Sequence, residues 1–274
     1  MKKAEPEKRK RRFKNRFKKG SPKNALVCAI PNMTTILALC TGFTAVRFAL
    51  NHQWEFVIGA IILAAILDSL DGRLARLLNS SSRFGAELDS LSDFVNFGVT
   101  PALVLYFYKL QEWGHYGWAV TLFFTVCMGL RLARFNSQTH DPNLPSWSME
   151  FFTGIPAPAA ALLGLIPLVV DLAFSASYPH TIFNTLFCAL WTVFTGFMMI
   201  STLATFSFKK MKIPEKYMFK LLFIFSITTV LVVTAPWLTY LGICFAYFGT
   251  WFFSYKKKKA YIKQDDYLKD AISF

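Results

Sequence analysis

Apolar residues along the chain gather into long blocks that are separated by short polar or charged segments. Eight of these blocks are interpreted as membrane-spanning helices, at residues 31–50, 54–70, 94–109, 117–134, 156–175, 181–206, 217–234 and 236–254. A backbone inside hydrocarbon must satisfy its own hydrogen bonds, so helices are expected rather than isolated strands. The pattern therefore predicts an all-α fold, a polytopic membrane helix bundle of about eight transmembrane helices.

Composition supports this interpretation and excludes a large soluble domain. Hydrophobic residues make up 54% of the 274 residues, and charged residues make up only 17%. Soluble domains usually contain about 45–50% apolar residues and about 25% charged residues. We expect a basic tail without fixed structure at 1–26, a transmembrane domain at 27–255 and a basic C-terminal tail at 256–274. The five cysteines lie far apart and form no Cys-x-x-Cys or Cys/His cluster, so a zinc site is not expected.

Basic residues are concentrated on alternate polar segments. The formal net charge is +14, and Lys and Arg are dense in residues 1–26 and 256–259. The polar segments near 73–83, 131–134 and 209–216 are also basic, and they alternate with segments poor in Lys and Arg. Basic segments beside transmembrane helices mark the cytoplasmic side and contact anionic lipids, so both termini are expected to be cytoplasmic. A basic tail also suits nucleic acid, but no nucleic-acid-binding fold follows it, and no such partner is expected.

Four aspartates between residues 68 and 93 carry the clearest chemical signal. Asp68 and Asp71 are three residues apart, so they share one face of the helix that continues from the second apolar block. Asp89 and Asp93 are four residues apart and share a face of a following helix. Small residues in this region, such as Gly72, allow helix backbones to approach closely. The two pairs are therefore expected to meet across a helix–helix contact.

Four carboxylates in one place repel one another unless cations neutralise them. Hard divalent cations such as Mg²⁺ or Mn²⁺ prefer oxygen ligands, and two ions about 3.5–4 Å apart can clamp a phosphoryl group. Arg76 follows Asp68 by eight residues on nearly the same helix face, where it can meet a phosphate. Loop acids paired with Arg73, Arg76 and Arg83 are the alternative, but acids at a membrane boundary are usually functional.

The spacing of these residues forms an extended motif. It is Asp68-x-x-Asp71-Gly72-x-x-Ala75-Arg76, eight further residues, then Gly85-x-x-x-Asp89-x-x-x-Asp93. This motif resembles the whole signature of the CDP-alcohol phosphatidyltransferase family. The stretches 30–34, 89–102, 130–136 and 154–160 look like one branch of that family, the bacterial-type phosphatidylserine synthases. The resemblance covers roughly residues 27–170.

The resemblance implies a reaction and a set of roles. Family members transfer the phosphatidyl group of CDP-diacylglycerol to an alcohol and release CMP, and in this branch the alcohol is L-serine and the product phosphatidylserine. Carried over residue by residue, Asp68, Asp71 and Asp89 would bind two Mg²⁺ or Mn²⁺ ions, and Asp93 would bind one and act as general base. The residues implied to bind the CDP-lipid are Gly72, Arg76 and Ser82, with Pro31, Asn32 and Thr34 at the nucleotide end. A bacterial inner membrane enzyme with a cytoplasmic active site is expected, and family members are often dimeric.

The acceptor site is inferred from the charges of the substrate. L-Serine is a zwitterion, and its carboxylate requires Arg or Lys. Arg131 and Arg134, with Asn136, lie at the cytoplasmic end of the fourth apolar block, where either arginine could bind the serine carboxylate. Anchoring of these arginines to lipid phosphates is the alternative.

Three other functions fit parts of this pattern. A sister enzyme could use glycerol 3-phosphate or an inositol phosphate, which would require a larger basic pocket. A cation transporter would place its acids near the middle of the bilayer and usually has pseudo-symmetric halves. An isoprenoid-type synthase would need Asp-Asp-x-x-Asp, which is absent from the sequence.

Overall fold

The computed structural model describes most of the apolar region and little of the tails. The described residues are 25–80, 82–139, 151–174, 182–201, 204–206 and 217–249. The predicted tails at 1–26 and 256–274 lie outside this set, apart from residues 25 and 26, and the whole basic segment 209–216 also lies outside it.

The described chain is almost entirely helical, and each of the eight apolar blocks contains helix. The α-helices are α2 (Ala25–Leu50), α3 (Trp54–Leu77), α4 (Arg83–Phe94), α5 (Thr100–Tyr108), α6 (His115–Thr139), α7 (Ala157–Gly164), α8 (Ile166–Phe174), α9 (Ile182–Ile200) and α10 (Met218–Thr234), with a further helix at 236–249. A π-helical turn, η1 (Val95–Val99), joins α4 to α5 without a break, and a 3-10 turn, η2 (Leu110–Trp113), precedes α6. The all-α expectation is confirmed for the bulk of the described chain.

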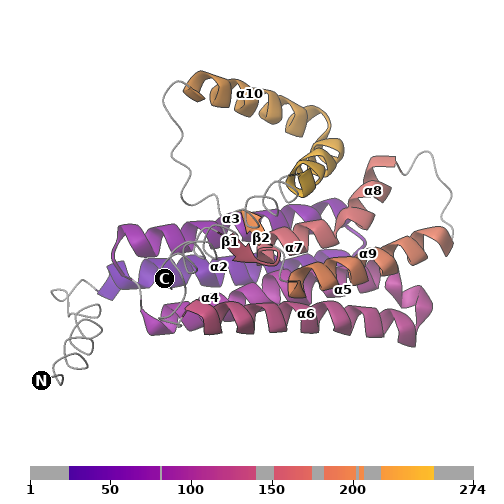
Figure 1. The fold of residues 1–274 in the computed structure, drawn as a ribbon, viewed down its shortest axis with the longest axis horizontal. Coiled ribbons are helices and arrows are strands. Elements are labelled where there is room, and N and C mark those ends of the chain that lie inside the picture. The colour runs from indigo at the N-terminus through magenta and orange to yellow at the C-terminus, as the bar shows by residue number, and fades with distance from the viewer. Residues whose placement is uncertain are drawn as a thin grey trace, which may run out of the picture.

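The long helices lie side by side in a bundle (Figure 1). α2 and α3 form a hairpin closed by a short turn at residues 51–53, and the rod made of α4, η1 and α5 packs against α2. α6 runs back along α5 and contacts α9, and α7 packs between η1 and α9. At the left end of the bundle in Figure 1, α3 ends, α4 begins and α6 ends, so their terminal polar residues are brought together.

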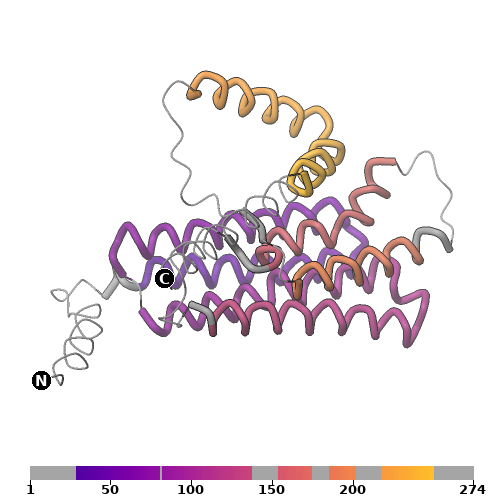
Figure 2. The backbone as a smooth tube through the Cα atoms, in the orientation of Figure 1, coloured from indigo at the N-terminus to yellow at the C-terminus, as the bar shows by residue number. Residues whose placement is uncertain are grey.

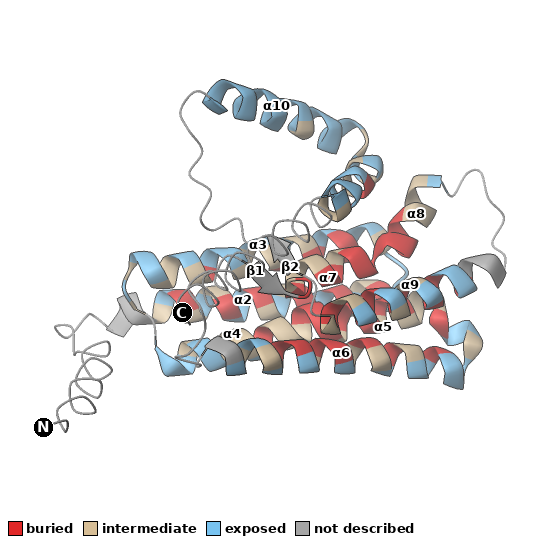
Figure 3. Cartoon of the chain, in the orientation of Figure 1, coloured by how far each residue is buried: buried red, intermediate tan, exposed pale blue. Residues whose placement is uncertain are grey.

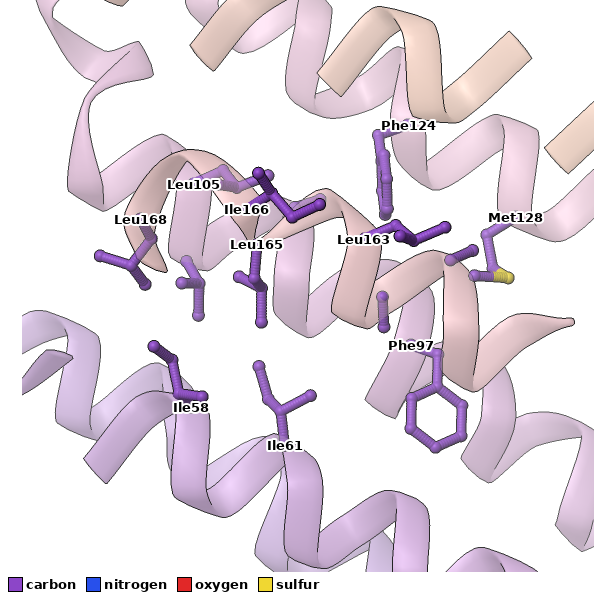
Figure 4. Close-up of a cluster of buried hydrophobic side chains, with 14 of the residues drawn as sticks. Ile58, Ile61, Phe97, Leu105, Phe124, Met128, Leu163, Leu165, Ile166 and Leu168 are labelled. Atoms are coloured by element: carbon purple, nitrogen blue, oxygen red, sulfur yellow. The ribbon is translucent and has the colours of Figure 1, made fainter. Parts of the chain in front are cut away.

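The interior of the bundle is apolar. Buried side chains from α3, η1, α5, α6, α7 and α8 meet in one cluster, which includes Ile61, Phe97, Leu105, Phe124 and Leu165 (Figure 4). Figure 3 shows the buried residues on the inward faces of these helices and exposed residues on the outward faces. Many of the exposed residues are large and apolar, for example Phe56 and Leu190 at 61% and 62% exposure. A soluble surface rarely carries such extensive apolar area, whereas lipid chains would cover it.

Several helices are long and apolar enough to cross a membrane. Among the described residues these are Ala29–Leu50, Arg83–Tyr108 and His115–Ser137, and α7 with α8 makes a fourth if this bent pair is one span. The bend between α7 and α8 is 41°. Pro167 at the second position of α8 has no N–H to donate to the preceding turn, which accounts for the interruption of the predicted 156–175 helix. The protein is therefore a polytopic helical membrane protein.

Two short strands depart from the purely helical expectation. β1 (Phe151–Thr153) pairs antiparallel with β2 (Ala204–Phe206), so that Phe151 lies opposite Phe206. The block predicted as helix to residue 206 thus ends as α9 at Ile200. An apolar run does not by itself distinguish the last turn of a helix from a short strand.

The helices at the C-terminal side of the described chain differ in their packing. α10 lies apart from the bundle in Figures 1 and 2, and none of its side chains is buried. The helix at 236–249 returns to the bundle, where the Tyr240 hydroxyl donates to the main-chain oxygen of Leu162 in α7 at 2.6 Å. A helix that is apolar on all sides and unburied by protein suits contact with lipid.

Candidate metal centre

The carboxylates of α3 and α4 come together at one end of the bundle. α3 continues beyond its apolar block to Leu77, and Asn79 adopts a left-handed conformation (φ 48°) that turns the chain. Ser82 then caps α4, because its side-chain oxygen accepts from Gly85 N at 2.9 Å. Through this turn the acids of the two helices face each other.

Three of the aspartates form a compact group. One carboxylate oxygen from each of Asp68, Asp71 and Asp89 lies within 4.8 Å of the other two. Asp71 is buried, with 3% exposure, and the other two are half-buried. The helical spacing read from the sequence thus places residues of both predicted pairs at one site.

Asp93 lies beside this group. Its carboxylate is near enough to Asp68 for a direct side-chain interaction, although Asp93 does not belong to the group of three. Oδ1 of Asp68 and Oδ1 of Asp93 are both buried without a hydrogen-bond partner. Among the described residues, none of the four aspartates forms an ion pair with a Lys or Arg.

These acids fit a site for hard divalent cations. Their donor atoms are all carboxylate oxygens, which Mg²⁺ and Mn²⁺ prefer. Buried oxygens without a partner and converging negative charge would be costly without a cation between them. The donor set and its geometry therefore support metal binding.

The residues predicted to bind the CDP-lipid lie around the same end of the bundle. Oδ1 of Asn32 in α2 lies 2.8 Å from the position that a Cβ on Gly85 would occupy, and Ser82 Oγ lies 3.1 Å from it. The absence of a side chain at Gly85 thus brings Asn32 and the start of α4 together. Pro31 is buried one residue earlier, whereas Thr34 donates to the main-chain oxygen of Ile30 at 3.1 Å.

Gly72 and Arg76 border an open face of α3. A Cβ built on Gly72 would meet nothing closer than Nη1 of Arg76, at 4.0 Å. The Arg76 side chain is exposed and has no ion pair or hydrogen bond among the described residues. An open face beside an unpaired guanidinium is suited to a phosphate-bearing ligand.

Sequence reasoning missed Thr35. This buried residue of α2 donates from Oγ1 to Oδ2 of Asp71 at 2.6 Å, so it contacts the carboxylate group directly. The preceding Thr34 is the residue that the family resemblance implies. Adjacent helix positions point about 100° apart, and no pattern in this single sequence shows which of two consecutive threonines faces a neighbouring helix.

The three acceptor candidates of α6 have different surroundings. Arg131 is buried, donates from Nε to the main-chain oxygen of Ile155 at 2.7 Å, and leaves Nη1 without a partner. Its guanidinium interacts electrostatically with Asp93. Arg134 donates from Nη2 to the main-chain oxygens of Met199 and Ser201 at 3.3 and 3.4 Å.

Asn136 lies near the end of α6, where its Nδ2 donates to Ser90 Oγ of α4 at 3.1 Å. This bond connects α6 to the helix that carries Asp89 and Asp93. Of the three candidates, Arg131 is therefore the one with a buried, unpaired donor close to the aspartates.

The fold and the site define a class: a helical membrane protein with a group of aspartates suited to a divalent metal at one end of its bundle. Residues 28–186 match the family model of the CDP-alcohol phosphatidyltransferases, and the chain belongs to this family. The relatives include a CDP-diacylglycerol–serine O-phosphatidyltransferase of Mycobacterium bovis, 41% identical over 218 residues, which cover 80% of this chain and 75% of the relative.

Two further relatives carry the same name. The Helicobacter pylori protein (strain 26695) is 37% identical over 182 residues, 66% of this chain and 73% of the relative. The Bacillus subtilis protein is 32% identical over 181 residues, 66% of this chain and 92% of the relative. The resemblance to the family and to its serine-specific branch is thus confirmed.

Proposed function

We propose that this protein transfers the phosphatidyl group of CDP-diacylglycerol to the hydroxyl of L-serine, giving phosphatidylserine and CMP. One observation carries the proposal: three aspartates of the family motif converge within 4.8 Å in a chain whose relatives are named for this reaction. The nearby Arg131 adds a buried donor suited to the carboxylate of an amino acid.

Asp68, Asp71, Asp89 and Asp93 would hold two Mg²⁺ or Mn²⁺ ions. When bound, such ions neutralise phosphate charge and stabilise the attacking and leaving oxygens. Oδ1 of Asp68 and Oδ1 of Asp93 are the buried oxygens that lack a partner within the described protein, and they are available for this role.

Asp93 is the proposed general base. The serine oxygen attacks the phosphorus of the phosphatidyl group, the bond from that phosphorus to the oxygen of CMP breaks, and the hydroxyl proton passes to the Asp93 carboxylate. A serine hydroxyl is a weak nucleophile, so a base within hydrogen-bonding reach accelerates the attack. A carboxylate that also binds metal is a modest base, so alignment of the reactants contributes much of the rate.

The remaining side chains would bind and orient the two substrates. Gly72, Arg76 and Ser82 are proposed to contact the CDP moiety, with Pro31, Asn32 and Thr34 at its nucleotide end, and Arg131, Arg134 and Asn136 at the acceptor side. The guanidinium of Arg131 has a donor free for the serine carboxylate, whereas that of Arg134 already binds main-chain oxygens. We therefore assign the serine carboxylate to Arg131.

The proposed membrane arrangement extends beyond the candidate spans found among the described helices. We propose eight spans, both termini in the cytoplasm, and a bacterial inner membrane location with the aspartates at the cytoplasmic face. Water-soluble serine and membrane-bound CDP-lipid can meet at such a surface. Anionic lipids would contact the basic segments, and a homodimer is proposed by analogy with the family.

Identification of the lipid product tests the function. Purified protein in detergent with CDP-diacylglycerol and Mn²⁺ is supplied separately with L-serine, glycerol 3-phosphate, inositol phosphate or no alcohol, and the lipid formed is identified by mass spectrometry. Phosphatidylserine and an equal amount of CMP are expected only in the sample that receives L-serine. Product formed from a phosphorylated alcohol would identify a sister enzyme, and CMP release that no alcohol stimulates would contradict the transferase proposal.

A further inference from the structure

A chain of buried hydrogen bonds connects Asp71 of α3 to three other helical segments. Thr35 of α2 donates to Asp71 of α3 at 2.6 Å. Ser92 Oγ of α4 lies 3.5 Å from the main-chain oxygen of Thr35 and accepts from Nδ2 of Asn96 in η1 at 3.2 Å. All four side chains are buried, with exposures of 0–4%. Polar groups in such surroundings are tightly constrained, because the loss of one partner leaves a buried atom unsatisfied.

The Thr35 hydroxyl has one proton and two acceptors within reach. Its oxygen lies 3.0 Å from the main-chain oxygen of Pro31, one helical turn earlier, and 2.6 Å from Oδ2 of Asp71. The shorter distance is typical of a hydroxyl that donates to a carboxylate. The main-chain oxygen of Pro31 is thus the competing acceptor. The branched side chain of threonine has few rotamers in a helix, and the rotamer found here directs the hydroxyl at Asp71.

Asp71 is the residue of the group whose orientation Thr35 can restrict. It is the most buried of the group of three, and two side-chain torsions determine where its oxygens lie relative to Asp68 and Asp89. A hydrogen bond to one oxygen restricts both torsions. Thr35 is itself stiff because its side chain is branched at Cβ, so it is a better support than a flexible donor.

We propose that Thr35 is a positioning residue, which holds the Asp71 carboxylate in the orientation that binds the metal before any substrate arrives. This rests on the proposed role of Asp71 as a metal ligand. Partners in the outer shell of metal sites typically contribute about 10–100-fold in metal affinity. Loss of the Thr35 hydroxyl is therefore expected to weaken Mn²⁺ binding by about that factor.

Mn²⁺ binding to the purified full-length protein in detergent, measured without substrate by the EPR signal of free Mn²⁺, tests the proposal. Thr35→Val keeps the branched shape and removes the hydroxyl, so its dissociation constant for Mn²⁺ should rise about 10–100-fold. Thr35→Ser retains a hydroxyl and should restore most of the affinity. Thr41→Val is the matched control, since Thr41 lies further along α2 and its hydroxyl donates to Leu37 O at 2.7 Å, within its own helix.

Turnover gives a second measurement. At low Mn²⁺ concentrations Thr35→Val should release CMP slowly, and saturating Mn²⁺ should recover most of kcat, because the ligands themselves remain. Wild-type Mn²⁺ affinity in folded Thr35→Val would overturn the proposal. If Thr35→Val does not fold, Thr35→Ala removes the same hydroxyl and leaves a smaller side chain. Wild-type Mn²⁺ affinity in Thr35→Ala would equally overturn the proposal.

Asp71→Asn separates this proposal from the one on which it rests. If Asp71→Asn binds Mn²⁺ as the wild type does, Asp71 is no ligand and both proposals about this residue fail. If Asp71→Asn loses Mn²⁺ while Thr35→Val retains it, the metal site stands and only the positioning role of Thr35 is refuted.

Discussion

Arg131→Lys is the most direct test of how the acceptor is bound. The Arg131 guanidinium lies buried beside Asp93, is held by its Nε bond to the main-chain oxygen of Ile155, and has Nη1 free. Lysine retains the positive charge but cannot donate simultaneously to Ile155 and to a carboxylate in the same fork geometry. The substitution therefore removes the proposed contact with serine while largely preserving the electrostatics around Asp93.

The size of the effect follows from the bond that is lost. A hydrogen bond to a charged group contributes about 1.5–3 kcal/mol, which corresponds to about 10–150-fold in a binding constant. The KM for L-serine should rise by about this factor. The KM for CDP-diacylglycerol should stay within about twofold, because Arg131 is proposed to contact only the acceptor.

CMP release measured against each substrate in turn gives the two KM values. Arg47→Lys is a suitable control: Arg47 lies exposed in the last turn of α2, at the opposite end of that helix from the residues near the aspartates. An unchanged serine KM in folded Arg131→Lys would refute the assignment of the carboxylate to Arg131. An equal rise in both KM values would instead indicate a general distortion of the site.

Three further outcomes are expected. Asp93→Asn should abolish phosphatidyl transfer, while CDP-lipid binding, measured by titration with radiolabelled CDP-diacylglycerol, should stay near that of the wild type. Near-normal turnover by this variant would exclude Asp93 as the base. Gly42→Ala should lower the midpoint of thermal unfolding, because a Cβ there would collide with the buried Asn96 side chain at a cost of about 1–3 kcal/mol. Gly59→Ala is the control: a Cβ on Gly59 would meet nothing within 4 Å, so the midpoint should stay unchanged. Removal of divalent ions with EDTA should stop CMP release and lower the unfolding midpoint, and addition of Mn²⁺ or Mg²⁺ should reverse both effects. Unchanged activity after EDTA treatment would contradict the metal centre.

The aspartate site could be anticipated because its information is local in the sequence. Helical spacing places Asp68 with Asp71 and Asp89 with Asp93, and only one short turn separates the two helices. The position of each pair could therefore be predicted without knowing how distant segments pack. The same locality explains why the polar extension of α3 was correctly predicted as helix.

Features that depend on contacts between distant segments could not be predicted in this way. Arg131 and Arg134 are three residues apart and looked equivalent in the sequence, yet the first binds Ile155 O and the second binds oxygens at the end of α9. The choice between Thr34 and Thr35 depends on the rotation of α2 against α3. Likewise the pairing of β1 with β2 joins segments that are more than fifty residues apart and leaves no local signature.

The π-helical turn η1 makes the relative rotation of α4 and α5 depend on the number of residues between them. Each residue of an α-helix advances the side chains by about 100°, and a π turn accommodates an extra residue within an otherwise α-helical rod. Deletion of one residue from Val95–Val99 would let the rod relax into a regular α-helix. Asp89 and Asp93 would then turn away from α3, although the mean hydropathy of the span would barely change. The length of this segment is therefore under a geometric constraint that hydropathy does not reveal.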